Sequence, residues 1–320
     1  MDRQGALAGL RRTLARFAAH HLADAPSWCV ALSGGPDSLA LTAAAATVQP
    51  TTALIVDHGI QPGSEVVART AQRQAVDLGC TAAHLLRVQV GSAGGPEAAA
   101  RAARYAALDA ARAGAPVLLA HTLDDQAETV LLGLGRGSGP RSIAGMQPCD
   151  PPWYRPLLEV RRGVTHGVCA ELGLTAWNDP HNSDPRFTRV RLRTEVLPLL
   201  EDVLGGGVAR ALGRTASALR EDTEILDSMA EHDLAMARDG DGLAVAVVKE
   251  LPEALRRRVI RAWLLSSGAT GLTDHQIRAV DALVAAWRGQ GGVAVSWGVA
   301  NTRLFAERRG GTLTLRSEPV

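Results

Sequence analysis

The chain has few cysteines, a single lysine and no long apolar run, and these shortages exclude several classes of function. Its 320 residues include four cysteines, and no two are close enough for a CxxC zinc or redox motif. No run of about 18 uncharged apolar residues is present, so we expect no membrane span. The N-terminal segment carries arginines and lacks the apolar region of a signal peptide. We therefore expect a cytoplasmic protein with reduced thiols.

Arginine replaces lysine almost completely, because Lys249 is the only lysine among 34 basic residues. The formal net charge of +1 neither requires nor excludes a nucleic-acid partner. Between Arg186 and Arg220, however, seven arginines stand against three acidic residues. The planar guanidinium fork binds two phosphate oxygens at once, so this stretch is a candidate for phosphate recognition.

Short apolar runs alternate with helical patterns in the first half of the chain. We expect parallel strands and intervening helices in the order 28–32, 39–48, 52–56, 65–78, 84–90, 97–113, 116–120 and 124–134. Strands that alternate with helices of this length indicate an α/β domain with a mostly parallel, Rossmann-like sheet. Ligands of such sheets bind beyond the carboxyl ends of the strands.

The pattern changes after Gly135. Residues 135–152 are rich in glycine, proline and serine and are predicted to form a functional loop. Further helices are expected at 164–172, 188–235 with a break at three glycines, 252–266 and 273–288, and strands at 292–297 and 312–315. We predict a catalytic nucleotide-binding domain over residues 1–204, a helical linker over 205–244 and a small α+β substrate-binding domain over 245–320.

A glycine-rich segment lies between the first strand and its helix, and it consists of Ser33, Gly34, Gly35, Pro36, Asp37 and Ser38. Two glycines alone indicate only a tight turn. At a helix N-terminus, however, glycines let the backbone approach a phosphate, and the free N–H groups favour an anion. A carboxylate there needs a cation between it and the phosphate, so Asp37 is a candidate Mg²⁺ ligand.

Two further groups of polar residues follow strands. Asp57 and His58 end the second strand, where they would face a nucleotide or simply solvent. After the fourth strand come His121, Asp124, Asp125 and Glu128. Asp125 and Glu128 share a helix face, so they could bind a cationic amine, although acids also stabilise a helix start on their own.

Taken together, the motifs SGGxDS, VDHG and HxxDDxxET resemble the tRNA(Ile)-lysidine synthetase family of the PP-loop ATP pyrophosphatase superfamily. Further segments resemble that family in the same order, namely residues 100–105, 135–139, 143–146, 155–158, 179–184 and 188–193. Val190 departs from the pattern, because the family usually has asparagine there. The resemblance spans residues 28–200 and is weaker over 245–320.

The resemblance implies an enzyme that uses ATP and Mg²⁺ to adenylate the wobble cytidine of a CAU-anticodon isoleucine tRNA, which free lysine then attacks to form lysidine. Residues Ser33–Ser38 with Asp57, His58 and His121 would hold ATP. Asp37 and Asp124 would hold the metal, and Asp125 and Glu128 would hold lysine. The implied catalytic residues are Asp37, Arg101, Asp125 and Glu128.

The same resemblance places tRNA on the basic residues. The arginines expected to contact it are Arg136, Arg141, Arg155, Arg186, Arg189, Arg191 and Arg193. Arg161 and Arg162 lie beside this group in the sequence and are expected on the same basic surface. Family members are often dimers, so a homodimer is compatible with the resemblance, although no sequence feature establishes one.

Three other functions compete with this interpretation. A PP-loop enzyme that thiolates tRNA would need cysteines at a suitable spacing, which the chain lacks. A PP-loop ligase for a small molecule would lack the arginine-rich stretch. A tRNA-binding module without activity would not need Asp37, Asp125 and Glu128.

Overall fold

The computed structural model describes residues 5–59, 61, 63–91, 95–137, 139–180, 184–298 and 302–319. Ser138 and residues 181–183, which belong to two of the motifs, lie outside this set. The chain divides into two compact units. The first comprises Met1–Gly135 with Gly145–Ala216, and the second comprises Arg136–Ala144 with Ser217–Val320.

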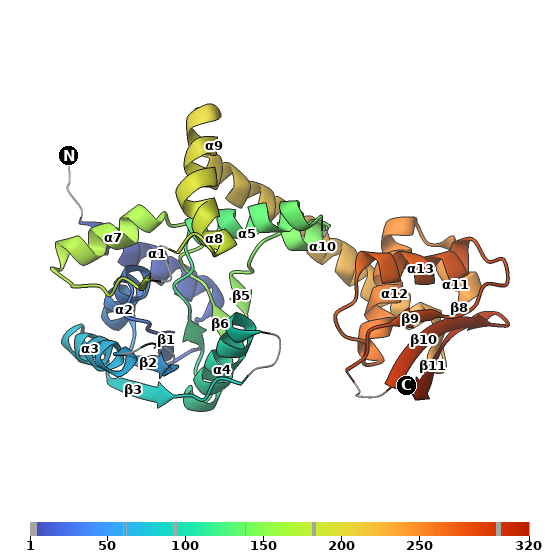
Figure 1. The fold of residues 1–320 in the computed structure, drawn as a ribbon, viewed down its shortest axis with the longest axis horizontal. Coiled ribbons are helices and arrows are strands. Elements are labelled where there is room, and N and C mark those ends of the chain that lie inside the picture. Colours follow the sequence, from blue (N-terminus) through green and yellow to red (C-terminus); the bar gives the residue numbers. More distant parts are fainter. Residues whose placement is uncertain are drawn as a thin grey trace. The chain divides into compact units, whose positions relative to one another are not determined.

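The first unit contains a six-stranded sheet in the order β3-β2-β1-β4-β6-β5 (Figure 1). All neighbouring pairs are parallel except β5 with β6, which confirms the expected α/β class. The chain order reverses beside β1, so the carboxyl ends of β1 and β4 flank a topological switch point, where ligands bind in open α/β sheets. The strands are β1 (Trp28–Ala31), β2 (Thr51–Asp57), β3 (Ala82–Arg87), β4 (Val117–Leu118), β5 (Cys149–Asp150) and β6 (Trp153–Tyr154).

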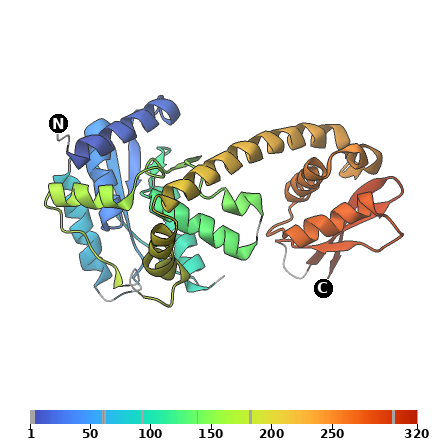
Figure 2. The same ribbon diagram turned by 90° about the horizontal axis from the view of Figure 1, so that it is seen from above.

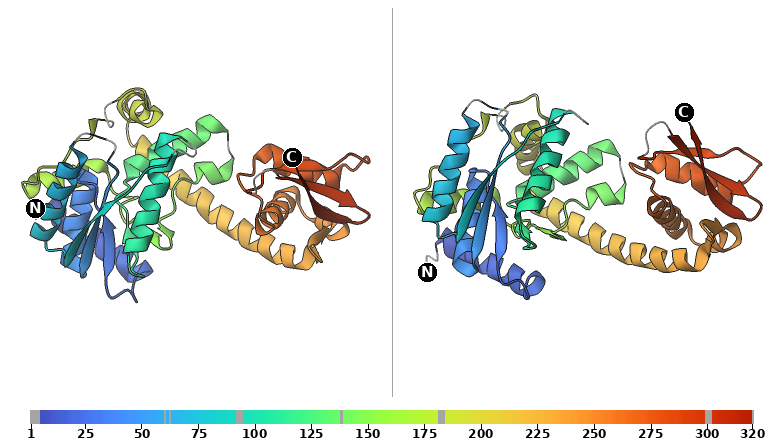
Figure 3. Two further views of the ribbon diagram at one scale, coloured as in Figure 1. Left: turned by 60° about the horizontal axis from the view of Figure 1, so that its bottom comes forward. Right: turned by 90° about the horizontal axis from the view of Figure 1, so that it is seen from below.

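Helices cover both faces of this sheet. Leu41 and Ala71 belong to the core on the face that carries α1, α2, α3 and α7, and Leu108 joins Leu54 and Val117 beneath α4. Figure 3 shows the strands between α3 on one side and α4 on the other. The helices are α1 (Ala6–His21), α2 (Pro36–Val48), α3 (Ser64–Asp77), α4 (Pro96–Ala111) and α7 (Arg162–Glu171).

Helix α1 was not expected from the sequence. Its buried residues Leu10, Leu14 and Ala18 recur every four positions, which is a helical period. Arginines between them dilute the pattern, and only the contact with α2 and α7 shows which face is apolar. Two expected strands also differ in length. The strand predicted at 116–120 is the two-residue β4, Val117–Leu118. The strand predicted at 84–90 is β3, which begins and ends earlier, at Ala82 and Arg87.

The helical region after the sheet packs against α5 (Leu123–Arg136). Ala127 of α5 shares a small core with Leu197 and Ala209. This region begins with α8 (Thr188–Arg191), a π-helical turn η2 (Leu192–Val196) and α9 (Leu197–Val203). Pro198 follows that turn and has no N–H to donate, so one regular helical hydrogen bond is missing there.

The second unit is the expected small α+β structure. Its antiparallel sheet has the order β7-β8-β11-β10-β9, and its core includes the fully buried Trp263 and Leu313. A capping box at Thr273 starts α13. The elements are α6 (Pro140–Ile143), β7 (Arg238–Asp239), β8 (Gly242–Ala244), α11 (Val245–Glu250), α12 (Glu253–Ser266), α13 (Asp274–Ala285), β9 (Val293–Val295), β10 (Thr302–Arg309) and β11 (Thr312–Pro319).

One helix, α10 (Val208–Ala237), belongs to both units and lies within the range 205–244 expected to link them. Figure 2 shows it as one continuous helix. The glycines at 205–207 precede it, as the sequence predicted. No helix in the described part of the chain is long and apolar enough to span a membrane.

Candidate active site

The glycine-rich segment forms a tight turn between β1 and α2. Gly34 has φ +83°, a conformation that favours glycine, and its carbonyl oxygen accepts a hydrogen bond from the Trp177 N–H at 2.9 Å. The Ser33 N–H donates to Ser38 Oγ at 3.2 Å, and the two serine hydroxyls lie 3.1 Å apart. The turn is therefore pre-organised at the start of α2, with polar groups suited to an anion.

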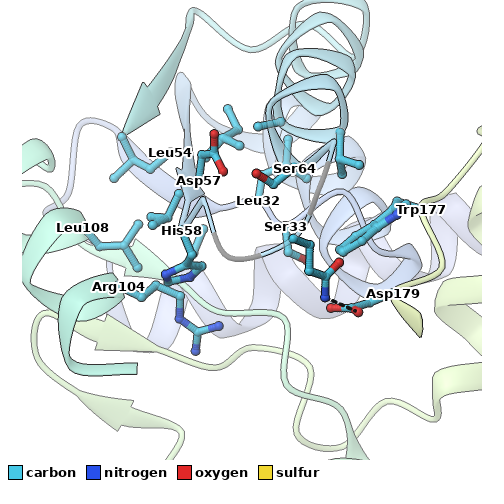
Figure 4. Close-up of a pocket in the computed structure, with 16 residues that line it drawn as sticks. Leu32, Ser33, Leu54, Asp57, His58, Ser64, Arg104, Leu108, Trp177 and Asp179 are labelled. Atoms are coloured by element: carbon cyan, nitrogen blue, oxygen red, sulfur yellow. Dashed lines mark hydrogen bonds between the residues drawn. The ribbon is translucent and has the colours of Figure 1, made fainter. Parts of the chain in front are cut away.

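A cavity of about 300 Å³ lies beside this turn (Figure 4). Its walls come from the ends of β1 and β2, from α3 and α4, and from Trp177 and Asp179. Leu54, Ala68 and Leu108 line it together with polar side chains. A mostly apolar cleft with a few polar groups at the carboxyl ends of parallel strands is a typical small-ligand site.

Two buried nitrogen atoms of this cavity have no hydrogen-bond partner in the described structure. They are His58 Nδ1 and Arg104 Nε, and Figure 4 shows the two side chains next to each other. Burial lowers the pKa of His58, and the Arg104 charge lowers it further. Buried polar groups are rarely left unpaired, so these atoms indicate that a polar ligand completes the cavity.

The acidic residues predicted from separate motifs meet at one guanidinium, that of Arg162 at the start of α7. Arg162 Nε lies 3.4 Å from Asp37 Oδ2, and Nη2 lies 2.6 Å from Asp125 Oδ1. Its Nη1 lies 3.4 Å from Glu128 Oε1, and Glu128 is fully buried. Asp37, Asp125 and Glu128 are thus brought together, and Arg162 offsets part of their charge.

Asp37 lies in the first turn of α2, where the Thr165 hydroxyl donates a short hydrogen bond to Oδ1. Burial raises the pKa of Asp37, against the opposing effects of Thr165 and Arg162. Its carboxylate stands directly after the phosphate-suited turn. Oxygen donors next to phosphate groups are the ligands that Mg²⁺ prefers.

Asp124 and Asp125 begin α5 but have different partners. Burial opposes ionisation of Asp125, yet Arg162 and two hydrogen bonds from Thr122 hold its pKa below the ordinary value. Asp124 instead accepts from the Arg162 backbone N–H at 2.7 Å and faces Arg161 Nη2 at 3.1 Å. Asp124 is therefore occupied by protein donors through both of its carboxylate oxygens.

Glu128 has a second arginine partner. Arg193 Nε donates to Glu128 Oε1 at 2.8 Å, and Nη2 donates to Oε2 at 3.2 Å. Arg193 belongs to the π-helical turn η2, and such turns are frequent at functional sites. Of the arginines expected to contact tRNA, Arg193 thus lies inside the acidic cluster.

His121 lies in the segment between β4 and α5, where it is half-buried near Asp125. Its Nδ1 atom has no hydrogen-bond partner in the described structure. Burial lowers the pKa of His121 to about 4, so the imidazole is neutral at pH 7. A neutral buried imidazole can donate or accept one hydrogen bond to a bound ligand.

The remaining candidates lie in several environments. Arg101 is on α4, with its guanidinium 4.8 Å from the Tyr105 ring centroid. The Asp57 carboxylate accepts from the Gly59 N–H at 3.0 Å and also lines the cavity. Arg155 is 7% exposed and donates to the Gln147 carbonyl, so its guanidinium is directed into the protein rather than toward a partner.

The other arginines expected to contact tRNA are solvent-exposed or half-buried. Arg186 pairs with Asp184, Arg191 pairs with Glu195, and Arg141 pairs with Asp227. Arg189 is exposed, whereas its neighbour Val190 is buried. Arg136 ends α5 and is exposed.

Sequence reasoning did not find the roles of Arg162, Thr165 and Trp177. One signal for Arg162 was available. It is the first residue of α7, where the helix dipole disfavours a cation. An arginine at such a position indicates that carboxylates from elsewhere in the fold offset its charge.

Comparisons with known proteins agree with this geometry. Residues 8–200 match the model of the PP-loop domain, and residues 243–314 match the TilS substrate binding domain. The chain is 67% identical over 324 residues to the tRNA(Ile)-lysidine synthase of Mycobacterium tuberculosis strain H37Rv, with complete coverage of both chains. It is 62% identical to that of Nocardia farcinica, covering 97% of this chain and 98% of the relative.

Among solved structures, a U34-tRNA thiolase, NcsA from Methanococcus maripaludis, aligns with a TM-score of 0.55 and 16% identity. The alignment covers 67% of this chain and 79% of that one, and it supports the fold only. The phosphate-suited turn, the adjoining cavity and the acidic cluster occur in a chain that matches its relatives over its whole length. The chain therefore belongs to the tRNA(Ile)-lysidine synthase family.

Proposed function

We propose that this protein is a ligase that joins free lysine to the wobble cytidine of the CAU-anticodon isoleucine tRNA, at the expense of ATP. The observation that carries the proposal is the convergence of Asp37, Asp125 and Glu128 on Arg162 beside the phosphate-suited turn. Full-length identity of 67% to a named tRNA(Ile)-lysidine synthase supports the same reaction.

The reaction has two steps with different needs. The oxygen at ring position 2 of cytidine attacks the α-phosphate of ATP, and pyrophosphate leaves. The lysine amine then attacks ring carbon 2, the bond to AMP breaks, and the amine gives up a proton. The first step needs donors for phosphate oxygens, and the second needs carboxylates for a cationic substrate.

The cavity beside the turn fits the nucleoside part of ATP. Residues Ser33–Ser38 would hold the phosphates, and the unpaired atoms of His58 and Arg104 would contact the ribose or base. Asp57 belongs to the polar lining of the cavity. His121, in the segment after β4, does not line the cavity and is proposed as a further ATP contact on the family resemblance. Arg101, on the same helix as Arg104, is the candidate for a contact with the adenylate phosphate.

Mg²⁺ fits one of the two residues proposed for it. The ion is usually held by one or two carboxylates together with substrate phosphates, and Asp37 offers such a carboxylate after the turn. Asp124 fits less well, because protein donors hold its two oxygens at 2.7 and 3.1 Å, whereas Arg162 Nε lies 3.4 Å from Asp37 Oδ2. No group of three or more ligand side chains suited to a metal is found among the described residues. Bound with ATP, the ion would offset charge that builds on the α-phosphate.

Asp125 and Glu128 are the proposed partners of the lysine ammonium groups. In the structure both carboxylates also pair with Arg162 and Arg193. A bound lysine must therefore share these oxygens with two guanidiniums or replace one of them. The buried site makes each such charge pair stronger than it would be in water.

We further propose that tRNA contacts the exposed arginines Arg136, Arg141, Arg186, Arg189 and Arg191. Arg155 is buried and Arg193 belongs to the acidic cluster, so we assign these two lesser roles. Residues 1–204 would be the catalytic domain and 245–320 the tRNA-binding domain, with the match over 243–314 in support. A cytoplasmic location and a homodimer are proposed on the family resemblance alone.

A thiolation reaction, the alternative from the same superfamily, is less compatible with the thiols. Burial raises the pKa of Cys29, Cys149 and Cys169, and it raises the pKa of Cys80 to about 11. Since the thiolate is the reactive form of cysteine, none of the four is activated.

The test is incorporation of labelled lysine into RNA. The purified protein, ATP, Mg²⁺ and labelled lysine would be incubated with an isoleucine tRNA transcript, and in parallel with elongator methionine tRNA, which shares the anticodon. We expect label in the isoleucine tRNA alone. Asp37→Ala should reduce incorporation at least about 100-fold, because charge stabilisation at the phosphate is lost. Label in neither tRNA would refute the proposed reaction.

A further inference from the structure

We propose that three arginines of the second unit, Arg141, Arg258 and Arg261, form a binding site for a backbone phosphate of the tRNA. The inference rests on the proposed function, which supplies the RNA partner. It adds two residues, Arg258 and Arg261, that the sequence did not single out. It also assigns Arg141 to a specific cluster rather than to a general basic surface.

The cluster is built around one carboxylate, Asp227 of α10. Arg141, from α6, places both terminal nitrogens on Asp227, with Nη1 at 2.5 Å from Oδ2. Arg258, from α12, places Nη1 2.6 Å from Oδ1. Two separate helices of the second unit therefore bring guanidiniums to a single acceptor on a third.

Arg261 adds a third positive charge. It lies three residues after Arg258 on α12, and residues at this spacing share one helix face. Burial and the neighbouring Arg141 charge lower the pKa of Arg261, against the effect of Asp227. In the part of the chain that the structure describes, Arg261 has no hydrogen bond or ion pair. Asp227 therefore leaves a surplus of two positive charges on half-buried side chains.

Two neighbouring arginines of α12 have structural roles, because carboxylates of the protein pair with them. Arg256 and Arg257 both pair with the buried Asp281, and Arg257 also pairs with Glu253. Those charges are compensated within the protein. The charge of Arg261 is not compensated by a carboxylate pair, and in the described structure Arg261 holds no other segment in place. Segment 136–144 is already tied to α10 by Arg141 and by Arg220, whose Nη2 donates to the Ala144 carbonyl at 3.1 Å.

A phosphodiester suits this arrangement. It carries one negative charge and two free oxygens, which match the paired N–H groups of guanidiniums. The side chains of Arg141 and Arg258 are 37% and 16% exposed, so the cluster is reachable without being fully hydrated. Contacts to RNA phosphates of this kind fix the orientation of the RNA and make its affinity depend on salt.

The experiment measures tRNA affinity of the full chain by fluorescence anisotropy at several salt concentrations. For Arg261→Gln we expect the Kd for the isoleucine tRNA to rise roughly 5-fold and the salt slope to fall by about one. The rate of lysine incorporation at saturating tRNA should not change. The matched control is Arg278→Gln, an exposed arginine of α13 paired with Asp274, which should leave the Kd unchanged.

Asp227→Asn separates phosphate binding from a purely structural role. If the cluster binds phosphate, the larger surplus of positive charge should keep or increase the affinity for tRNA. If the ion pairs only anchor residues 136–144, this variant should weaken tRNA binding and Arg261→Gln should have no effect. That pattern would overturn the inference.

Two further outcomes have separate meanings. Inorganic phosphate at constant ionic strength is the probe for a free anion. Phosphate could stabilise the unchanged protein against unfolding but not the Arg261→Gln variant. If that variant also bound tRNA with unchanged affinity, the assignment of the site to RNA would be overturned. If the unchanged protein incorporates lysine but Arg261→Gln binds tRNA normally, only this inference fails. If the unchanged protein neither binds tRNA nor incorporates lysine, the proposed function fails with it.

Discussion

Among single residues, His121 shows most directly how burial changes chemistry. Burial is the main cause that lowers its pKa to about 4, while Asp125 opposes the shift. The unfolded chain takes up the proton near pH 6.5 and the folded chain only near pH 4. The stability due to neutral His121 is therefore complete above about pH 6.5 and is lost as the pH falls toward 4.

We expect this loss to approach about 3 kcal/mol of unfolding free energy. Urea unfolding of the unchanged protein and of His121→Gln at about pH 7 and about pH 5 measures it. The variant should lose less stability between these two pH values, because glutamine does not titrate. Equal losses in both proteins would show that His121 is not the group responsible.

Arg162 is the residue on which the acidic cluster depends. It is 17% exposed and offsets part of the charge of Asp37, Asp125 and Glu128. We expect Arg162→Met to reduce the unfolding free energy by about 3 kcal/mol or more, since Asp37 loses its arginine partner and the buried Glu128 keeps only Arg193. Urea unfolding near pH 7 is the measurement.

The neighbouring Arg161 provides the control. It is 38% exposed and pairs with Asp124 and Glu201. Arg161→Met should cost no more than about 1 kcal/mol, because water screens exposed ion pairs. Comparable costs for the two variants would contradict the role assigned to Arg162.

At the level of secondary-structure elements, Gly145 allows the loop after α6 to approach helix α5 closely. It has φ +68°, and a Cβ there would lie 2.6 Å from Gln126 Oε1. Gln126 is buried and holds Met146 through two hydrogen bonds, at 2.7 and 2.9 Å. An alanine would have to displace this amide in addition to adopting a strained conformation.

We expect Gly145→Ala to lower the unfolding free energy by roughly 2–4 kcal/mol. The control is Gly163→Ala, because Gly163 lies within α7 and a Cβ added there would meet no heavy atom of a neighbouring segment within 4 Å. That variant should be neutral or stabilise by about 0.5–1 kcal/mol. Denaturant unfolding of both variants tests the pair, and a neutral Gly145→Ala would contradict the predicted clash.

Across the molecule as a whole, the two units have separate hydrophobic cores and share helix α10. One core includes Leu41 and Leu118 of the first unit, and another includes Trp263 and Leu313 of the second. The proposed nucleotide cavity is lined entirely by residues of the first unit. Binding energy from ATP should therefore stabilise the first unit directly.

Hydrogen exchange with a non-hydrolysable ATP analogue tests this expectation. Amides of β1, β2 and the N-terminal turn of α2 should exchange more slowly when the analogue is bound. Amides of β10 and β11 should exchange at unchanged rates. Equal protection of both sets would mean that the units are energetically coupled.

Local patterns in the sequence were enough to predict the class of fold and the main chemical groups. Alternating strands and helices, the glycines at 34 and 35, and the acids at 37, 125 and 128 are such patterns, with local consequences. A glycine turn at a helix start favours an anion, and carboxylates at strand ends lie at the ligand-binding edge of a sheet, whatever fold the rest of the chain adopts. The class of the small α+β region was predicted for the same reason, although its strand β10 was not expected.

How those groups are paired depends on the tertiary structure. Arg162, Arg193 and Arg155 look alike in sequence to the exposed arginines, yet each meets carboxylates or carbonyls brought from other segments. Where helix α1 and the two-residue strand β4 begin and end likewise depends on the segments that they pack against. Charge compensation and burial depend on which segments approach each other, and that is a property of the folded chain rather than of any local pattern.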